Sequence, residues 1–281
     1  FSDEIVSVTG KVESSFGDPL TGAQANMQSN SDNFQFTTNG QGVFSKCNIP
    51  PADYTFSVGR WGYETSCEEI AVVSSMQLEK ELQAGYYDDF QFHFGWESLG
   101  NSEKGRWVRA IPFGTEFEQA LSNPNRDVDG DCNDYAYVTG NANDSTPGTD
   151  DVDDGSAVLR SPEMDLSTYQ NPYIVVYRWF YNGGGTILFP TVANDTLILK
   201  LEYEGEIFPV KKITRESSMS AWVKEYIRVL DYLPQSGKVR FIAEAIDVPP
   251  GHLVEAGIDR FMVIDSVLSA NNQENIQSLP V

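Results

Sequence analysis

The sequence predicts an all-β protein made of two β-sandwiches in tandem. Short segments in which apolar and polar residues alternate recur along the 281-residue chain, as expected for half-buried strands. Turns that contain glycine, proline or asparagine separate these segments. The pattern shows no convincing amphipathic helix, and a chain of this length accommodates two ordinary domains.

The first third of the chain has the strand spacing of a β-sandwich, with about seven short strands in some 80 residues. The clearest segments are VSVTGKVES (6–14), NFQFTT (33–38), GVFSK (42–46), YTFSVG (54–59), EEIAVV (68–73) and MQLEKEL (76–82). The sequence NGQG (39–42) predicts a tight turn that joins two of them in a hairpin, because Asn-Gly tolerates positive φ angles.

The rest of the chain predicts a larger jelly-roll sandwich of about ten strands. The candidate segments are FQFHFGW (90–96), GRWVRAIP (105–112), DYAYVTG (134–140), SAVLRSP (156–162), NPYIVVYRWFY (171–181), DTLILKLEYEG (195–205), EIFPVKKI (206–213), WVKEYIRVL (222–230), KVRFIAEAI (238–246) and VEAGIDRFMVID (254–265). The segment TEFEQALSN (115–123) is the exception, and we expect one or two helical turns there.

The formal net charge of −22 limits the classes of partner. A protein this acidic repels phosphates, which argues against nucleic acid and against anionic membrane surfaces. The charge fits an extracellular protein, a cation binder or adaptation to a salty medium. The sequence has no run of eighteen apolar residues, so we expect no membrane insertion. Because it starts FSDEIV, we expect a processed product or an excised fragment.

Several motifs of the first segment occur in the order of a known family. They are VTGKV, PLTGA, TNGQGVFS and IPPADYTFSVGRWGYE, and they span about residues 5–84. In this order they resemble the carboxypeptidase regulatory-like domain, a transthyretin-like β-sandwich. The resemblance implies a non-catalytic folding or spacer module.

A second series of motifs spans about residues 88–266. It comprises GRWVRAIPFGT, YVTGNAN, TDDVDDGSAVLRSPEMDLS, NPYIVVYRWFYN, NDTLILKL and VEAGIDRFMVID. The series resembles the MAM-like jelly-roll modules that follow catalytic domains in secreted bacterial metallopeptidases. In such proteins of the Bacteroidetes, a polar linker like SANNQENIQSLPV usually precedes a sorting domain for type IX secretion. The triplets that begin at Asp144, Asp195 and Asp265 resemble the O-glycosylation sites of that group.

The three cysteines fit no zinc motif. Cys47 and Cys67 lie at the ends of predicted strands and could form a disulfide, although two separate buried thiols fit the sequence nearly as well. Such a bridge would close a loop of about 20 residues and contribute ~3 kcal/mol. We expect the remaining Cys132 to be a small buried residue.

Catalytic signatures are missing from the sequence. It contains two histidines and neither an HExxH motif nor a Gly-x-Ser-x-Gly elbow. We expect His93 to lie in a strand and His252 in a loop. Acidic residues are so numerous that a carboxylate pair for glycoside hydrolysis carries no information here, and that alternative stays open.

The motif TDDVDDG (149–155) places four aspartates within five positions. Side chains alternate along a strand, so Asp151 and Asp153 are expected on one side, where a cation between them would relieve their repulsion. Calcium fits best, because the available ligands are all oxygen atoms on a flexible loop. The alternative is a solvated acidic loop.

A second acidic stretch has the D-x-D-x-D spacing that opens a calcium loop, with Asp127 and Asp129 as candidate ligands. It is not an EF-hand, because Cys132 and Val138 stand where Gly and Glu are required. A solvated acidic turn is the alternative here as well.

Jelly rolls often complete a calcium site with acids of the first and last strands. The candidates for that role are Asp89, Glu97 and Asp259.

Four tryptophans of the second segment have two interpretations. Trp96, Trp107, Trp179 and Trp222 could form a sugar-stacking platform, but each lies in an alternating strand pattern that favours core packing for most of them.

These observations predict a regulatory-like sandwich at 1–86, a MAM-like jelly roll at 87–268 and a polar linker at 269–281. We expect non-catalytic accessory modules of a larger secreted or cell-surface protein, a metallopeptidase, with structural calcium in the second module. The alternatives are a carbohydrate-binding module and a surface adhesin or structural subunit. The expected partners are calcium and an extracellular glycan or protein.

Overall fold

The computed structural model describes residues 6–142, 146–184 and 192–265, and within them the fold is all-β. The described residues form 21 strands and two short 3-10 helices. The chain divides into two compact units, residues 1–92 and 93–281, whereas the sequence places the boundary after residue 86. The proposed linker at 269–281 lies outside the described residues. None of the described helices is long and apolar enough to cross a membrane.

The first unit is a sandwich of two sheets, with strand orders β4-β1-β7 and β3-β2-β5-β6. Its strands are β1 (Val6–Ser14), β2 (Gln24–Gln28), β3 (Asn33–Thr37), β4 (Val43–Ile49), β5 (Ala52–Gly59), β6 (Ser66–Val72) and β7 (Met76–Leu82), followed by the short β8 (Tyr86–Asp88). Alternate residues of β1, such as Val8 and Val12, are fully buried, and Tyr54 and Phe56 of β5 lie in the same core. The alternation of the sequence therefore locates most of these strands, although it misses β2.

The predicted hairpin at NGQG is wrong. Strands β3 and β4 belong to different sheets, so the turn between them connects the two layers of the sandwich. The positive φ angle falls on Gly42, at 71°, and not on the Asn39-Gly40 pair. The side chain of Asn39 accepts hydrogen bonds from the backbone amides of Gln41 and Val43, which stabilises this sheet-to-sheet turn.

Of the two alternatives for Cys47 and Cys67, a disulfide between them is not formed. Cys47 is a free, exposed cysteine on β4, whereas Cys67 lies on β6 in the other sheet. The expectation that Cys132 is buried is also wrong, because this residue is exposed. Cysteine spacing along the chain does not determine which sheet or which face a cysteine occupies.

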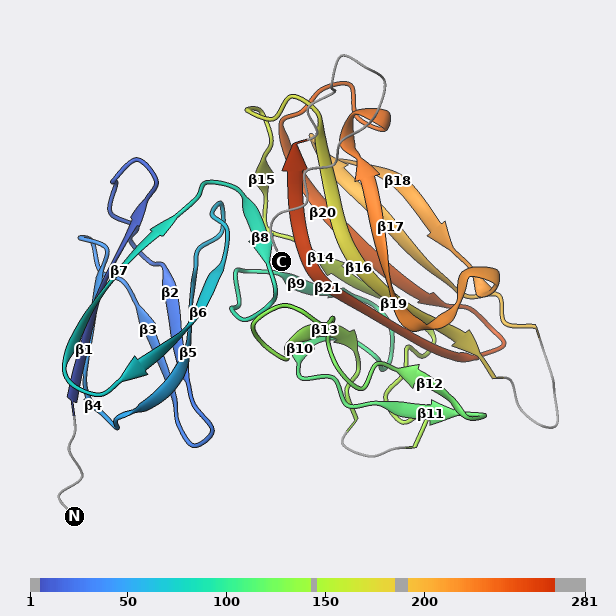
Figure 1. Ribbon diagram of the computed structural model, residues 1–281. Helices are drawn as coiled ribbons and strands as arrows, with labels where there is room; N and C mark the ends of the chain where they lie inside the picture. Colours follow the sequence, from blue (N-terminus) through green and yellow to red (C-terminus); the bar gives the residue numbers. More distant parts are fainter. Residues whose placement is uncertain (1–5, 143–145, 185–191, 266–281) are drawn as a thin grey trace, which may run out of the picture. The chain divides into compact units, whose positions relative to one another are not determined.

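The second unit is a larger sandwich of two sheets, with strand orders β10-β13-β21-β16-β19 and β18-β17-β20-β14-β9 (Figure 1). The bounds of the first sheet are β10 (Trp107–Ala110), β13 (Ala136–Thr139), β16 (Pro172–Gly183), β19 (Met219–Arg228) and β21 (Leu253–Asp265). Those of the second are β9 (Glu97–Gly100), β14 (Gly155–Arg160), β17 (Thr196–Tyr203), β18 (Glu206–Ile213) and β20 (Lys238–Asp247). The short β15 (Met164–Asp165) also pairs with β20, and the 3-10 helices are η1 (Arg215–Ser217) and η2 (Val229–Asp231).

Buried aromatic side chains hold these two sheets together. Phe241 on β20 lies 5.6 Å from Phe261 on β21, measured between ring centroids, and Trp96 packs edge-on against both rings. The indole N–H of Trp107 on β10 donates a hydrogen bond of 3.0 Å to the backbone oxygen of Ala157 on β14. The Phe241–Phe261 and Trp107–Ala157 contacts cross from one sheet to the other, so they fix the distance and alignment of the layers.

Two segments of the second unit differ from their predicted structure. FQFHFGW (90–96) forms no strand. TEFEQALSN forms a hairpin of β11 (Thr115–Phe117) and β12 (Ala120–Asn123) in place of helical turns. Glu118 and Gln119 between them have φ angles of 49° and 70°, the left-handed pair of a two-residue hairpin turn. Trp179 anchors the hairpin by donating its indole N–H to the backbone oxygen of Ser122, at 2.8 Å.

Substitution of Gly140 tests how tightly the TDDVDDG loop packs against the turn after β13. A Cβ at Gly140 would lie 1.9 Å from the backbone oxygen of Asp150, and the glycine has a φ of 61°. Gly140→Ala should therefore lower the free energy of unfolding by more than about 2 kcal/mol. Gly205→Ala is the matched control, because Gly205 also has positive φ but open space around its Cβ, and it should cost about 1 kcal/mol. Equal losses in chemical denaturation would contradict the tight packing.

Candidate functional site: carboxylates around strand β21

Strand β21 brings several ionisable side chains into the interior of the second unit. Glu255 and Asp259 lie on the strand and His252 directly precedes it, and each residue is at most 5% exposed. Buried carboxylates are costly unless they are protonated, hydrogen-bonded or paired with a cation. The surroundings of each group therefore indicate where a ligand is required.

A β-bulge determines the direction of the Asp259 side chain. Strict alternation would place Asp259 on the same face as Phe261, which lies in the aromatic core. The register with β16 shifts between Val175 and Tyr177, and Arg260 opposite this shift has a φ of 47°. The extra residue breaks the alternation, and Oδ2 of Asp259 accepts a hydrogen bond of 2.8 Å from the backbone amide of Val128.

Asp259 meets two aspartates of the loop that precedes β13. One carboxylate oxygen from each of Asp127, Asp131 and Asp259 lies within 4.8 Å of the others. Asp259 is fully buried, and Oδ2 of Asp127 is buried and has no hydrogen-bond partner. Gly130, with a φ of 92°, allows the loop to turn so that residues 127 and 131 face the same point.

The electrostatics of this cluster disfavour three bare carboxylates. Burial raises the pKa of Asp127 to about 6, and the negative charges of Asp134 and Asp129 contribute to the rise. Burial, reinforced by the charge of Asp131, also raises the pKa of Asp259 well above its usual range. In the part of the chain that the structure describes, neither Asp127 nor Asp259 forms an ion pair with lysine or arginine. Either protonation or a bound cation would neutralise this cluster.

The TDDVDDG motif precedes β14 and gives its aspartates different environments. Asp151 is buried near Glu255, whose carboxylate accepts a hydrogen bond of 3.0 Å from the hydroxyl of Thr139. Burial, with the charge of Asp153 adding to it, raises the pKa of Asp151 to about 7. Asp153 forms an ion pair of 2.8 Å with Lys104. Asp151 and Asp153 thus do not converge with Asp259 on one site.

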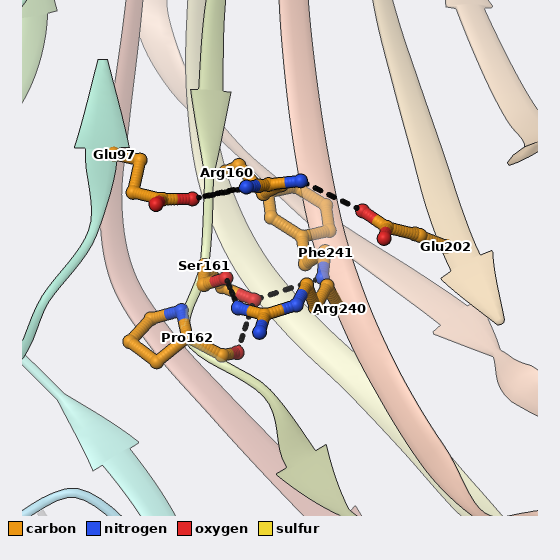
Figure 2. Close-up of polar contacts among 7 residues, drawn as sticks. All are labelled: Glu97, Arg160, Ser161, Pro162, Glu202, Arg240 and Phe241. Atoms are coloured by element: carbon orange, nitrogen blue, oxygen red, sulfur yellow. Dashed lines mark hydrogen bonds and ion pairs between the residues drawn. The ribbon is translucent and has the colours of Figure 1, made fainter. Parts of the chain in front are cut away.

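The remaining predicted ligands are not members of the cluster. Figure 2 shows the side chain of Arg160 between the carboxylates of Glu97 and Glu202, at 2.6 Å and 3.5 Å. The carboxylate of Asp129 is exposed and lies 3.4 Å from Arg126. Asp89 belongs to the first unit, where its side chain accepts a hydrogen bond from the backbone amide of Gln91. Of the seven predicted ligands, the structure brings together Asp127 and Asp259.

The third member of the cluster, Asp131, was missed as a ligand although the D-x-D-x-D spacing contains it. Alternation places residues 127, 129 and 131 alike on one side of an extended chain, so it does not single out Asp131. The segment is a turn in the structure, so positions four residues apart converge and Asp129 points to solvent.

A polar pocket of about 380 Å³ lies on the second sheet of this unit. Its lining includes Glu163, Glu202, Tyr203, Gln235, Lys238 and Arg240. Arg240 donates a hydrogen bond to the backbone oxygen of Ser161, as Figure 2 also shows, and Gln235 donates one to the hydroxyl of Tyr203. The lining offers hydrogen-bond donors and acceptors to a small polar ligand.

Most of the four tryptophans that could have formed a sugar-stacking platform lie in the core of the second unit. Trp96, Trp107 and Trp179 are at most 3% exposed, which confirms core packing for most of the tryptophans. Trp222 is half-buried against Trp179.

The two histidines differ in exposure. His93 is exposed and lies outside any strand, contrary to expectation, and His252 is buried. Of the three O-glycosylation-like sites, Thr196 is only 7% exposed, and Ser145 and Ser266 lie outside the described residues.

The fold and the site define a class: an all-β chain of two sandwich units, with buried carboxylates in the second. No protein-family model and no curated protein matches the chain. Among solved structures, it is similar to the K1 cleaved adhesin domain of Lys-gingipain from Porphyromonas gingivalis W83 (9% identity, TM-score 0.40, 66% of this chain and 99% of that chain). It is also similar to a carbohydrate-binding module of the β-sandwich superfamily (9% identity, TM-score 0.36, 87% and 86%).

A partial similarity to catechol 1,2-dioxygenase from Pseudomonas arvilla C-1 has 11% identity and a TM-score of 0.26. It covers 30% of this chain, and the chain spans about half (54%) of that enzyme's length. TM-scores of this size do not establish a common fold, and nothing about the ligand or activity of this chain follows from them.

The raised pKa values of Asp151 and Glu255 predict a pH-dependent stability. Both groups keep a proton in the folded state at pH values where the unfolded chain, with pKa values near 4, has lost it. Their contribution is therefore greatest below pH ~4 and is lost as the pH rises towards ~7. Asp151→Asn should gain stability relative to the parent between pH 5 and pH 8, by ~1 kcal/mol or more.

Asp231→Asn is the matched control, because Asp231 is an exposed carboxylate in a single ion pair with Arg228. It should show no such gain in urea unfolding curves at the two pH values. A flat difference between Asp151→Asn and the parent would contradict the buried, protonated state of Asp151.

Proposed function

We propose that this chain supplies two non-catalytic β-sandwich modules of a larger extracellular protein, and that the second module binds one calcium ion. The ion would be held by Asp127, Asp131 and Asp259. Such modules position or display other parts of a protein, and a bound ion fixes the loops from which they do so. The sequence resemblance to accessory modules of secreted metallopeptidases supports that class of parent protein.

The convergence of three carboxylates around fully buried Asp259 carries this proposal. Two of the three have raised pKa values, and neither of these two has a lysine or arginine partner among the described residues. An unpaired charge inside a protein costs several kcal/mol, so a folded state with these groups ionised requires a counter-ion. A divalent cation removes that cost and orders the loop that precedes β13.

The donor atoms select calcium from among the common divalent ions. The cluster offers only oxygen, from carboxylates on an irregular loop that also exposes backbone carbonyls. Calcium accepts six to eight oxygen ligands at ~2.3–2.6 Å in flexible geometry. Magnesium demands a regular octahedron with shorter bonds, and zinc prefers nitrogen or sulfur donors.

Calcium removal tests this proposal. In the full chain, chelator should lower the melting temperature, and added calcium at a hundredfold excess over its dissociation constant should restore ~2.7 kcal/mol. Asp127→Asn should abolish this response. Asp129→Asn is the matched control, because this exposed aspartate of the same loop pairs with Arg126 and should leave the response intact.

The parent protein also provides a test that does not depend on the folding of a variant. Dialysis against radioactive calcium should leave about one ion per chain. A parent protein that retains no calcium and melts identically with and without chelator would overturn the calcium site. That result would leave the proposal of extracellular modules unaffected, because this proposal rests on the sequence resemblance and not on the calcium site.

A carbohydrate ligand is the second candidate, and the polar pocket favours it. Sugar sites combine hydrogen-bonding side chains with an aromatic wall. Glu202, Gln235 and Arg240 supply polar groups beside the ring of Tyr203. The buried tryptophans do not contribute, so a ligand would bind through hydrogen bonds more than through stacking.

A glycan array followed by calorimetry tests the pocket. For any glycan that binds, Glu202→Gln should weaken the affinity about tenfold, since a charged hydrogen bond of ~1.5 kcal/mol is lost. Glu206→Gln is the control, because Glu206 is exposed on edge strand β18 and does not line the pocket. Equal affinity of both variants would exclude the pocket as the sugar site.

A further inference from the structure

A second buried cluster lies at one end of the sandwich and contains the only histidine of the chain besides His93. It consists of Asp195, Asp247 and His252, with ligand atoms within 4.8 Å of one another. All three residues are at most 5% exposed, and the side chains of Asp195 and His252 are fully inaccessible. The cluster differs from the calcium candidate because it offers a nitrogen as well as carboxylate oxygens.

Strand register brings the three residues together from distant parts of the sequence. Asp195 directly precedes β17, whose first residue Thr196 pairs with Ile246 on β20. Asp247 is the last residue of β20 and pairs with Gly155 at the start of β14. His252 follows the short turn after β20 and precedes β21. The positions of these side chains are therefore fixed by neighbouring strands of the sandwich.

Backbone hydrogen bonds orient both carboxylates. Oδ1 of Asp195 accepts the amide of Val248 at 2.8 Å. Oδ2 of Asp247 accepts the amide of Asp154 at 2.9 Å, and its Oδ1 accepts that of His252 at 3.4 Å. Contacts of this kind fix the direction of metal ligands in known sites. Burial, together with the neighbouring Asp195, nevertheless raises the pKa of Asp247, so the carboxylates lack a neutralising cation.

The outer oxygen of Asp195 remains without a hydrogen bond. Oδ2 is buried and lies 2.9 Å from Nδ1 of His252, a contact that is an ion pair only if the imidazole is protonated. A tetrahedral metal ion with bonds of ~2.0–2.2 Å holds neighbouring ligand atoms ~3.3–3.6 Å apart, so these two atoms would separate by about half an ångström when the ion binds. In the described part of the chain, no lysine or arginine pairs with Asp195 or Asp247. A divalent ion would make two carboxylates and a neutral imidazole electrically neutral overall.

From this geometry we propose that Asp195, Asp247 and His252 form a structural site for a divalent transition metal of the zinc type. The ligands are Oδ2 of Asp195, a carboxylate oxygen of Asp247 and Nδ1 of His252. The mixed nitrogen and oxygen donors favour zinc over calcium. Because the site is closed to solvent, the ion enters as the module folds and joins the ends of β17, β20 and β21.

Zinc binding to the full chain tests this site. The protein is stripped with chelator, saturated with calcium so that any oxygen-only site is filled, and titrated with zinc. The parent should bind one zinc ion, and His252→Gln should lose more than about 100-fold in affinity. Asp195→Asn should behave in the same way. His93→Gln, which alters the other, exposed histidine, should bind zinc like the parent.

Anomalous diffraction at the zinc edge provides a readout that does not require a folded variant. A peak between Asp195 and His252 in parent crystals supports the site. Two outcomes would overturn it: a parent that binds no zinc after stripping, or zinc binding that survives His252→Gln and disappears in His93→Gln. In the first case the residues form a plain histidine–aspartate pair, and in the second the ion occupies the surface.

Discussion

Strand β21 imposes the constraint on which the second module depends: it places ionisable side chains inside a sandwich that has to stay dry. The strand is central in its sheet and pairs with β13 and β16, so its backbone groups are satisfied and its position is fixed. Glu255 and Asp259 therefore cannot move outward to reach water, and their surroundings have to compensate for the buried charge. Burial raises the pKa of both carboxyls, which favours protonation, and the cation proposed above would serve the same purpose at Asp259.

The aromatic contacts between the sheets keep the strands that carry these buried groups in fixed positions. Because Phe241 and Phe261 meet across the layers, with Trp96 against both, β20 and β21 keep one alignment. The ends of the loops are held in fixed positions, since their first and last residues adjoin these aligned strands. Acidic residues that are far apart in sequence can then meet reproducibly, as they do around Asp259 and around His252. A looser core would let such like charges separate.

Most strands of both modules follow from local alternation, which reflects the side-chain period of two and needs no knowledge of the partner strand. The failures have a common cause. The segment NGQG resembles a hairpin turn but joins two sheets, and TEFEQALSN resembles a helical turn but forms a hairpin under Trp179. Both outcomes depend on what packs against the segment. Likewise, Asp127 and Asp259 were predicted as ligands, whereas the convergence of Asp131 with them required the turn at Gly130.

The sequence by itself determined the class of fold, the two-part organisation and the abundance of acids from which a cation site in the second module was predicted. Periodicity and composition carry this information because each is a local property of the chain. Only the tertiary structure decided which side chain each acid contacts. Asp153 pairs with Lys104, Glu97 pairs with Arg160, and Asp195 lies beside His252. Such pairings depend on the tertiary fold and its strand register, and the cluster around Asp259 depends in addition on the bulge at Arg260, where an extra residue redirects the Asp259 side chain.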